Sequence, residues 1–191
     1  MMDAWCLQNT GRPFDSEGAW AAQGQCLPDL LHHLLDEPYF SRPPPKSTGR
    51  DLFSLNWLAT KLRRYTAANP QDIQNTLTEL TAACCSASID SYANHSEALI
   101  VCGGGAFNAF LLARLQARLP RLQVRTSDAL GLPPMQVEAA AFAWLARQTL
   151  RQQPGNLPSA TGAAGPRILG AIYQQTELQC KEECSDLKQI Q

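Results

Sequence analysis

The residue types best suited to chemistry are three consecutive glycines, Gly103–Gly105, with Asn108 shortly after them. They follow a continuous apolar run, and a glycine turn at the carboxyl end of a strand lets a ligand approach the backbone without interference from a Cβ atom. A helix that follows directs free N–H groups and its positive dipole end to the same point, where the Asn108 amide can accept and donate hydrogen bonds. The pattern favours a ligand site. The spacing is not GxGxxG, and a glycine turn that serves only to reverse the chain is an equal alternative.

Glu138 is a second candidate, because it lies in the first turn of an expected apolar helix. A carboxylate at this place can orient a ligand hydroxyl in a cleft. The alternative is simple stabilisation of the helix end, which the helix dipole favours for any acidic residue.

A proline-rich stretch over residues 42–51 supplies the third candidate, Lys46. Three prolines stiffen the backbone into an extended arm that presents Lys46, Ser47, Thr48 and Arg50. From composition alone a surface connector is the favoured interpretation. The stretch is not a P-loop, because no glycine precedes the lysine at the required spacing.

The sequence shows no motif for other kinds of catalytic, metal or redox site. There is no GxSxG, no Ser/His/Asp set and no paired-carboxylate motif. The seven cysteines include no CxxC pair, so we expect neither a metal site nor a redox site. Cys84, Cys85 and Cys102 are interpreted as small buried apolar residues.

The expected elements place the glycine turn between two strands. An apolar run over 98–102 predicts a strand covered on both faces, and leucines spaced by four after Phe107 predict a helix that starts immediately. Alternation over 122–126 predicts a second strand. This strand–helix–strand unit requires parallel strands and a right-handed crossover.

Further helices flank this unit. Asn69 and Pro70 are a good N-cap and first helical residue for a long helix with one apolar stripe. Further helices are expected over residues 28–35 and 136–152, and a weak edge strand over 168–173. The fold class is therefore α/β, with a short, mainly parallel sheet flanked by helices. Two strands and a weak third are fewer than a usual sheet of five or six, so we expect part of a larger fold, with exposed apolar surface.

The composition and charge of the chain argue against some classes of partner. The chain has 191 residues, 45% apolar and 17% charged, and a formal net charge of −1. This balance gives no electrostatic footprint for nucleic acid or an anionic membrane, so neither is an expected partner. No apolar run approaches the length of a membrane span and the amino end lacks a signal-peptide pattern, which predicts a cytoplasmic location. We expect one domain over 1–173 and a polar, disordered tail over 174–191.

Several stretches in order resemble the anhydro-N-acetylmuramic acid kinase family over roughly residues 2–173. The motifs that carry the resemblance are MDAW (2–5), GRPFD (11–15), GAWAA (18–22), PPPKSTGR (43–50), VCGGGAFN (101–108), VEA (137–139), FAWLA (142–146), PGNLPS (154–159) and TGA (161–163).

The resemblance implies an actin-like (ribonuclease H-like) ATPase fold and a two-part reaction in cell-wall recycling. Water opens the 1,6-anhydro ring of anhydro-N-acetylmuramic acid, and ATP with Mg²⁺ phosphorylates O6. By the same resemblance Gly103–Gly105 and Asn108 match the adenosine-side motif, Lys46 lies near the nucleotide, and Glu138 faces the substrate. No residue of this chain is expected to be catalytic or to bind a metal.

The resemblance covers only the carboxyl-terminal portion of the family. It implies that the general-base aspartate and both phosphate loops lie in the part not matched, so this chain alone is expected to be inactive. The alternatives are a non-catalytic domain that binds adenine nucleotide weakly, a partner for a separately encoded amino-terminal half, or a homodimer.

Overall fold

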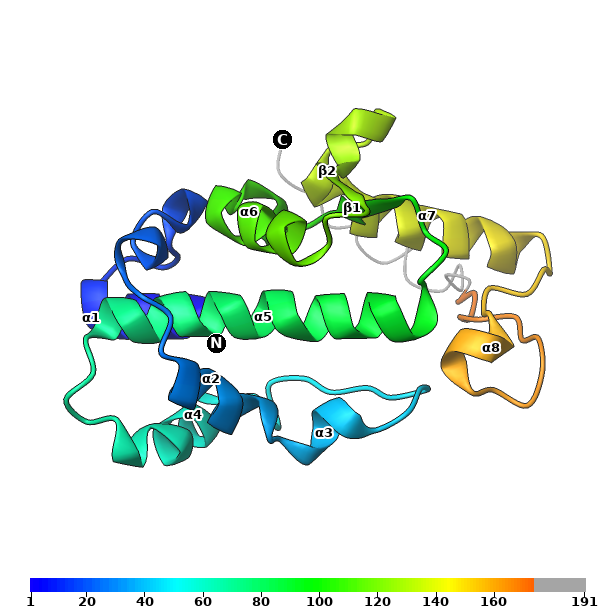
Figure 1. Ribbon diagram of the computed structural model, residues 1–191. Helices are drawn as coiled ribbons and strands as arrows, with labels where there is room; N and C mark the ends of the chain where they lie inside the picture. The colour runs from blue at the N-terminus through cyan, green and yellow to red at the C-terminus, as the bar shows by residue number, and fades with distance from the viewer. Residues whose placement is uncertain (174–191) are drawn as a thin grey trace, which may run out of the picture. The chain divides into compact units, whose positions relative to one another are not determined.

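The computed structural model describes residues 1–173 (Figure 1). It divides into two compact units, the first over Met1–Phe142 and the second beginning at Ala143, and each is described by itself. The boundary falls inside the single domain expected over 1–173, and that domain assignment stays a prediction. The expected polar tail, 174–191, lies outside the described residues.

Helix α5, Pro70–Tyr92, is the central element of the first unit. Asn69 caps it as predicted, with its Oδ1 atom accepting a hydrogen bond from the Gln71 N–H at 3.0 Å. The amino-terminal half of α5 is buried by α1, Met2–Thr10, α2, Pro28–Leu35, and α4, Leu55–Lys61 (Figure 1). The shared core is formed by leucines and one isoleucine: Leu30, Leu34, Leu58, Ile73, Leu77 and Leu80.

The sheet consists of two parallel strands, β1, Ala98–Val101, and β2, Gln123–Thr126. Helix α6, Ala109–Arg118, connects them, which confirms the predicted strand–helix–strand unit. Leu111 and Leu115 of α6 pack on Ala82 of α5, with Leu99, Val101 and Val124 of the sheet beside them. The expectation that the first strand is covered on both faces is wrong, because Ala98 is exposed and Leu99–Val101 are only half-buried.

An ion-pair cluster holds α6 on α5. Glu79 of α5 is buried, and its Oε2 atom accepts hydrogen bonds from Arg118 at 3.1 Å (Nε) and 2.9 Å. Arg114, one turn earlier on α6, pairs with the other carboxylate oxygen. Because α6 begins just after the glycine turn, this cluster also fixes that turn relative to α5.

Short helical turns complete the first unit. The 3₁₀ turns are η1, Ser16–Gly18, η2, Ala21–Gln23, η3, Leu62–Arg64, η4, Gly104–Phe107, η5, Ser127–Leu130, and η6, Pro134–Gln136. The short helix α3, Pro38–Ser41, precedes the proline-rich stretch.

Helix α7, Val137–Leu150, confirms the helix expected over 136–152, and α8, Pro158–Thr161, follows it. The edge strand expected over 168–173 is wrong. In the second unit the Leu169 carbonyl accepts from Thr149 of α7, and the Arg167 carbonyl accepts from the Gly155 N–H at 3.0 Å, so this segment folds back on its own loop. None of the helices over 1–173 is long and apolar enough to cross a membrane.

Candidate nucleotide-side site

The glycine turn leaves its backbone accessible. Gly103 has a φ of +70°, a conformation that L side chains rarely adopt, and its N–H donates to the Pro134 carbonyl at 3.0 Å. An ideal Cβ atom placed on Gly103 or on Gly104 would meet no atom within 4 Å. The first N–H groups of a helical turn have no partner inside it, so Gly104 and Gly105 present donors beside this open space.

Asn108 is held by the start of α6. The expectation that a helix starts directly after the glycines is wrong, because the 3₁₀ turn η4 comes first and leaves Phe107 exposed. Asn108 then caps α6, with its Oδ1 atom accepting from the Leu111 N–H at 2.8 Å. The amide oxygen is therefore used for capping, and the amide N–H groups are the part of this side chain that can contact a ligand.

Glu138 lies in the first turn of α7 and is exposed. Four residues earlier, Pro134 accepts the hydrogen bond from Gly103, and this bond brings the start of α7 beside the glycine turn. The carboxylate is therefore accessible from solvent, and its position at the helix end also fits the alternative of simple helix stabilisation.

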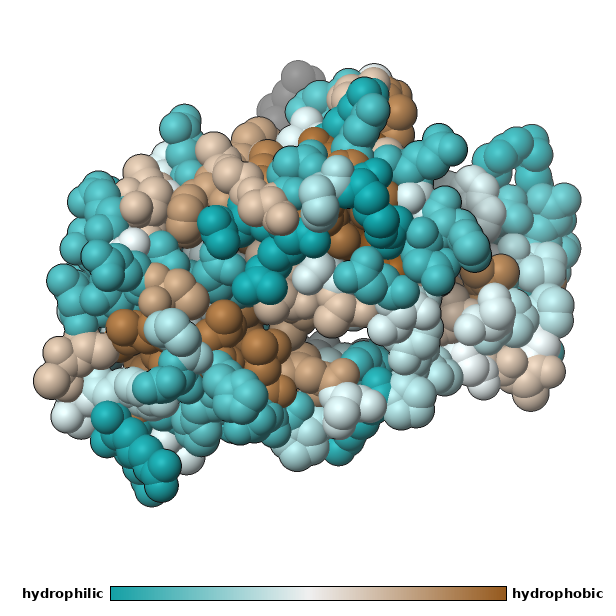
Figure 2. Space-filling model, in the orientation of Figure 1, coloured by the Kyte–Doolittle hydropathy of each residue, from teal (hydrophilic) through white to brown (hydrophobic). Residues whose placement is uncertain are grey.

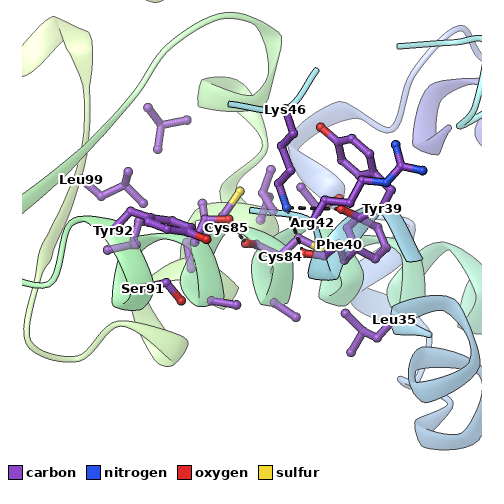
Figure 3. A pocket seen from close by; sticks show the side chains of 18 of the residues that line it. Leu35, Tyr39, Phe40, Arg42, Lys46, Cys84, Cys85, Ser91, Tyr92 and Leu99 are labelled. Atoms are coloured by element: carbon purple, nitrogen blue, oxygen red, sulfur yellow. Dashed lines mark hydrogen bonds between the residues drawn. The ribbon is translucent and has the colours of Figure 1, made fainter. Parts of the chain in front are cut away.

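Lys46 lies in the wall of a pocket of about 830 Å³ in the first unit. Its Nζ atom donates to the carbonyls of Tyr39 at 3.3 Å and Phe40 at 2.9 Å, and it lies 5.1 Å from the centre of the Tyr39 ring (Figure 3). Cys102, the residue before Gly103, lines the same pocket. Figure 2 shows this side of the molecule hollowed between α5 and the loop after α3.

Three cysteines line this pocket, and one of them, Cys84, also packs against the core around Leu77. The interpretation of Cys84, Cys85 and Cys102 as buried apolar residues is wrong: Cys84 is half-buried and the other two are exposed. Partial burial still raises the pKa of Cys84 to about 11. The adjacent Cys85 thiol also raises this pKa, whereas the Lys46 ammonium lowers it. Such thiols are poor nucleophiles at neutral pH.

Ser127 is a polar residue of this edge that the sequence pattern did not single out. The parallel register pairs Val101 with Thr126, so Ser127 and Cys102 both follow directly at the carboxyl ends of their strands. Ser127 is 5% exposed, and its hydroxyl has no hydrogen-bond partner among residues 1–173. Its position directly after β2 is the only signal the sequence offers. Over the same residues no group of three His, Cys, Asp or Glu side chains could hold a metal ion.

The structure therefore gathers Gly103–Gly105, Asn108 and the start of α7 at one edge of the sheet. Lys46 is not among these residues, and its link to this edge is that it lines the same pocket as Cys102. The assignment of these residues to nucleotide and substrate stays a prediction.

Comparisons with known proteins identify relatives of the whole described chain. The family model for anhydro-N-acetylmuramic acid kinase matches residues 1–175. The anhydro-N-acetylmuramic acid kinase of Albidiferax ferrireducens is 60% identical over 173 residues, which are 91% of this chain and 44% of the relative. Those of Variovorax paradoxus and Nitrosomonas europaea are 58% and 51% identical, again over 91% of this chain and over 46% and 47% of the relatives.

The chain spans less than half the length of the curated relatives that it matches. Its assignment to their carboxyl-terminal portion stays a prediction.

Proposed function

The chain belongs to the anhydro-N-acetylmuramic acid kinase family, and on this basis we propose that it is the nucleotide-side part of such an enzyme. The reaction opens the 1,6-anhydro ring of anhydro-N-acetylmuramic acid with water and transfers a phosphoryl group from ATP to O6. The product is N-acetylmuramic acid 6-phosphate, formed during recycling of the cell wall in the cytoplasm. The observation that carries the proposal is the family match over residues 1–175.

The proposed fold is a part of the actin-like ATPase fold. The parallel strand–helix–strand unit with a glycine turn at its carboxyl edge supports this assignment, because ligands of open parallel sheets bind at that edge.

Gly103–Gly105 and Asn108 are the proposed contacts for the adenosine side of ATP. The open space around Gly103 and Gly104 fits close approach of a nucleotide to the backbone. ATP with Mg²⁺ supplies the phosphoryl group when bound. The Asn108 amide N–H groups donate to the nucleotide while its oxygen keeps α6 capped.

Lys46 and Glu138 have less direct proposed roles. Two of the three Lys46 ammonium hydrogens are used by backbone carbonyls, which leaves one donor for an anionic group. The exposed carboxylate of Glu138 accepts a hydrogen bond from a sugar hydroxyl and so orients the substrate.

We propose that this chain by itself does not catalyse the kinase reaction. Phosphoryl transfer depends on positioning and on charge stabilisation from both walls of a cleft. By the family resemblance the general-base aspartate lies in the part that this chain does not match. What the chain retains is weak affinity for adenine nucleotide.

Calorimetric titration of the 191-residue chain with ADP tests this proposal. We expect measurable heat of binding for the wild type and none for Gly104→Val, because the added side chain fills the open approach to the backbone. Asn108→Asp retains an oxygen for the cap but loses the amide donors, so it weakens ADP binding without lowering stability. Absent binding by the wild type, or equal binding by Gly104→Val, contradicts the proposal.

A further inference from the structure

One edge of β1 is unpaired among residues 1–173. The Gln123 N–H donates to the Glu97 carbonyl at 3.1 Å, and Leu99 is aligned with Val124. In a parallel ladder with this register, Leu99 and Val101 direct their backbone groups to β2. Ala98 and Ile100 therefore direct their N–H and C=O groups to the opposite edge, where no strand of the described chain lies.

The pocket of about 830 Å³ follows this edge. Four consecutive residues, Leu99–Cys102, line it. Successive side chains of a strand point to opposite faces, so a pocket on one face would touch only alternate residues. Contact with four in a row means that the pocket runs along the side of the strand, beside its unpaired backbone groups.

The facing wall is suited to close approach of another backbone. It is formed by the carboxyl-terminal half of α5, mostly through small residues: Thr81, Ala83, Cys84, Cys85, Ala87, Ser88 and Ser91. Tyr92 and Leu99 border this wall, and Lys46 and Arg42 lie on the side of the loop after α3 (Figure 3). The amino-terminal half of α5 is covered by other helices, so the uncovered half coincides with the unpaired edge.

We infer that this groove receives a β-strand that pairs with β1 through Ala98 and Ile100. The strand comes from the part of an anhydro-N-acetylmuramic acid kinase chain that this chain does not match, on the same or a separate polypeptide. The inference rests on the proposed function for the identity of the partner. Two observations favour this occupant: the relatives are more than twice the matched length, and an added strand satisfies the outward backbone groups of β1.

Co-expression tests the docking without any nucleotide. The probe is the unmatched part of the Albidiferax ferrireducens relative, produced together with the tagged 191-residue chain and purified through the tag. We expect a one-to-one complex by analytical ultracentrifugation. In hydrogen exchange, the Ile100 amide should exchange at least tenfold more slowly in the complex, whereas Leu99, already bonded to β2, should change much less.

Ala87→Trp fills the groove from the exposed face of α5 and should weaken the complex at least tenfold. Ala59→Trp, on the exposed face of α4 and away from the groove, should change it less than twofold. Gly104→Val should leave docking intact even where it removes ADP binding. A failure of the strand-docking proposal can therefore be told apart from a failure of the nucleotide-binding proposal.

Three results overturn the inference. The first is that the unmatched part is soluble but does not co-purify with the wild-type chain. The second is a complex in which the Ile100 amide gains no protection. The third is self-association of the wild-type chain that Ala87→Trp suppresses, which assigns the groove to a second copy.

Discussion

Gly18 lies directly against the side-chain amide of Asn108. A Cβ atom on Gly18 would stand 2.2 Å from Oδ1 of Asn108 and 2.7 Å from Cβ of Phe110. Gly18 also has a φ of +72°, so both its conformation and its missing side chain are required here. Through this contact the turn η1 supports the residue that caps α6 beside the glycine turn.

Gly18→Ala should therefore lower the free energy of unfolding by about 2–3 kcal/mol. About 1–2 kcal/mol comes from the left-handed backbone and about 1 kcal/mol from the displaced cap. Urea denaturation measures the change. The matched control is Gly11→Ala, which has a φ of +73° but no atom within 4 Å of its Cβ position, so it shows the backbone cost alone. Equal losses for the two variants would show that Gly18 does not support Asn108.

The buried carboxylate of Glu79 is expected to be the main polar attachment between α5 and α6. Glu79→Gln removes the charge that pairs with Arg114 and Arg118, and we expect a loss of about 2 kcal/mol, because both guanidinium groups are partly exposed and recover water. Asp90→Asn breaks the exposed pair with Arg121 and should cost less than about 1 kcal/mol. Chemical denaturation measures the free energy of unfolding of both variants. Similar losses, both below about 1 kcal/mol, would contradict the role of Glu79 as the main polar attachment.

Stability should fall between pH 9 and pH 11. The thiol of Cys84 has an ordinary pKa of 9.0, which burial raises to about 11 in the folded chain. In this window the unfolded thiol has lost its proton while the folded thiol keeps it, so the free energy of unfolding decreases as pH rises. Cys84→Ala should flatten this part of the pH profile relative to the wild type. Burial also raises the pKa values of Cys26 and Cys85, so part of the slope should remain in Cys84→Ala. A slope in Cys84→Ala equal to that of the wild type would contradict the assignment.

The local elements around the site follow from short sequence signals. Asn69 and Pro70 fixed the start of α5, and the apolar run before Gly103 with alternation after Leu122 predicted the parallel pair. These signals work because caps, proline and side-chain period act within a few residues of the element that they define.

The features that sequence reasoning missed depend on distant partners. A leucine spacing of four includes Phe107 but does not show that Asn108 restarts the helix after a 3₁₀ turn. The exposure of Cys84 and Cys85 depends on what covers the second half of α5, which the residues of α5 itself do not specify. The contact of Gly18 with Asn108 joins positions ninety residues apart in sequence and has no local pattern.

Formation of N-acetylmuramic acid 6-phosphate from ATP and anhydro-N-acetylmuramic acid is the most direct measurement of the central claim. The account predicts turnover no higher than a mock purification for the 191-residue chain alone. It predicts turnover above that level for its complex with the unmatched part of the Albidiferax ferrireducens relative. Turnover by the chain alone, or an assembled complex that stays inactive with both substrates and Mg²⁺, would contradict the claim that this chain supplies one side of the kinase cleft.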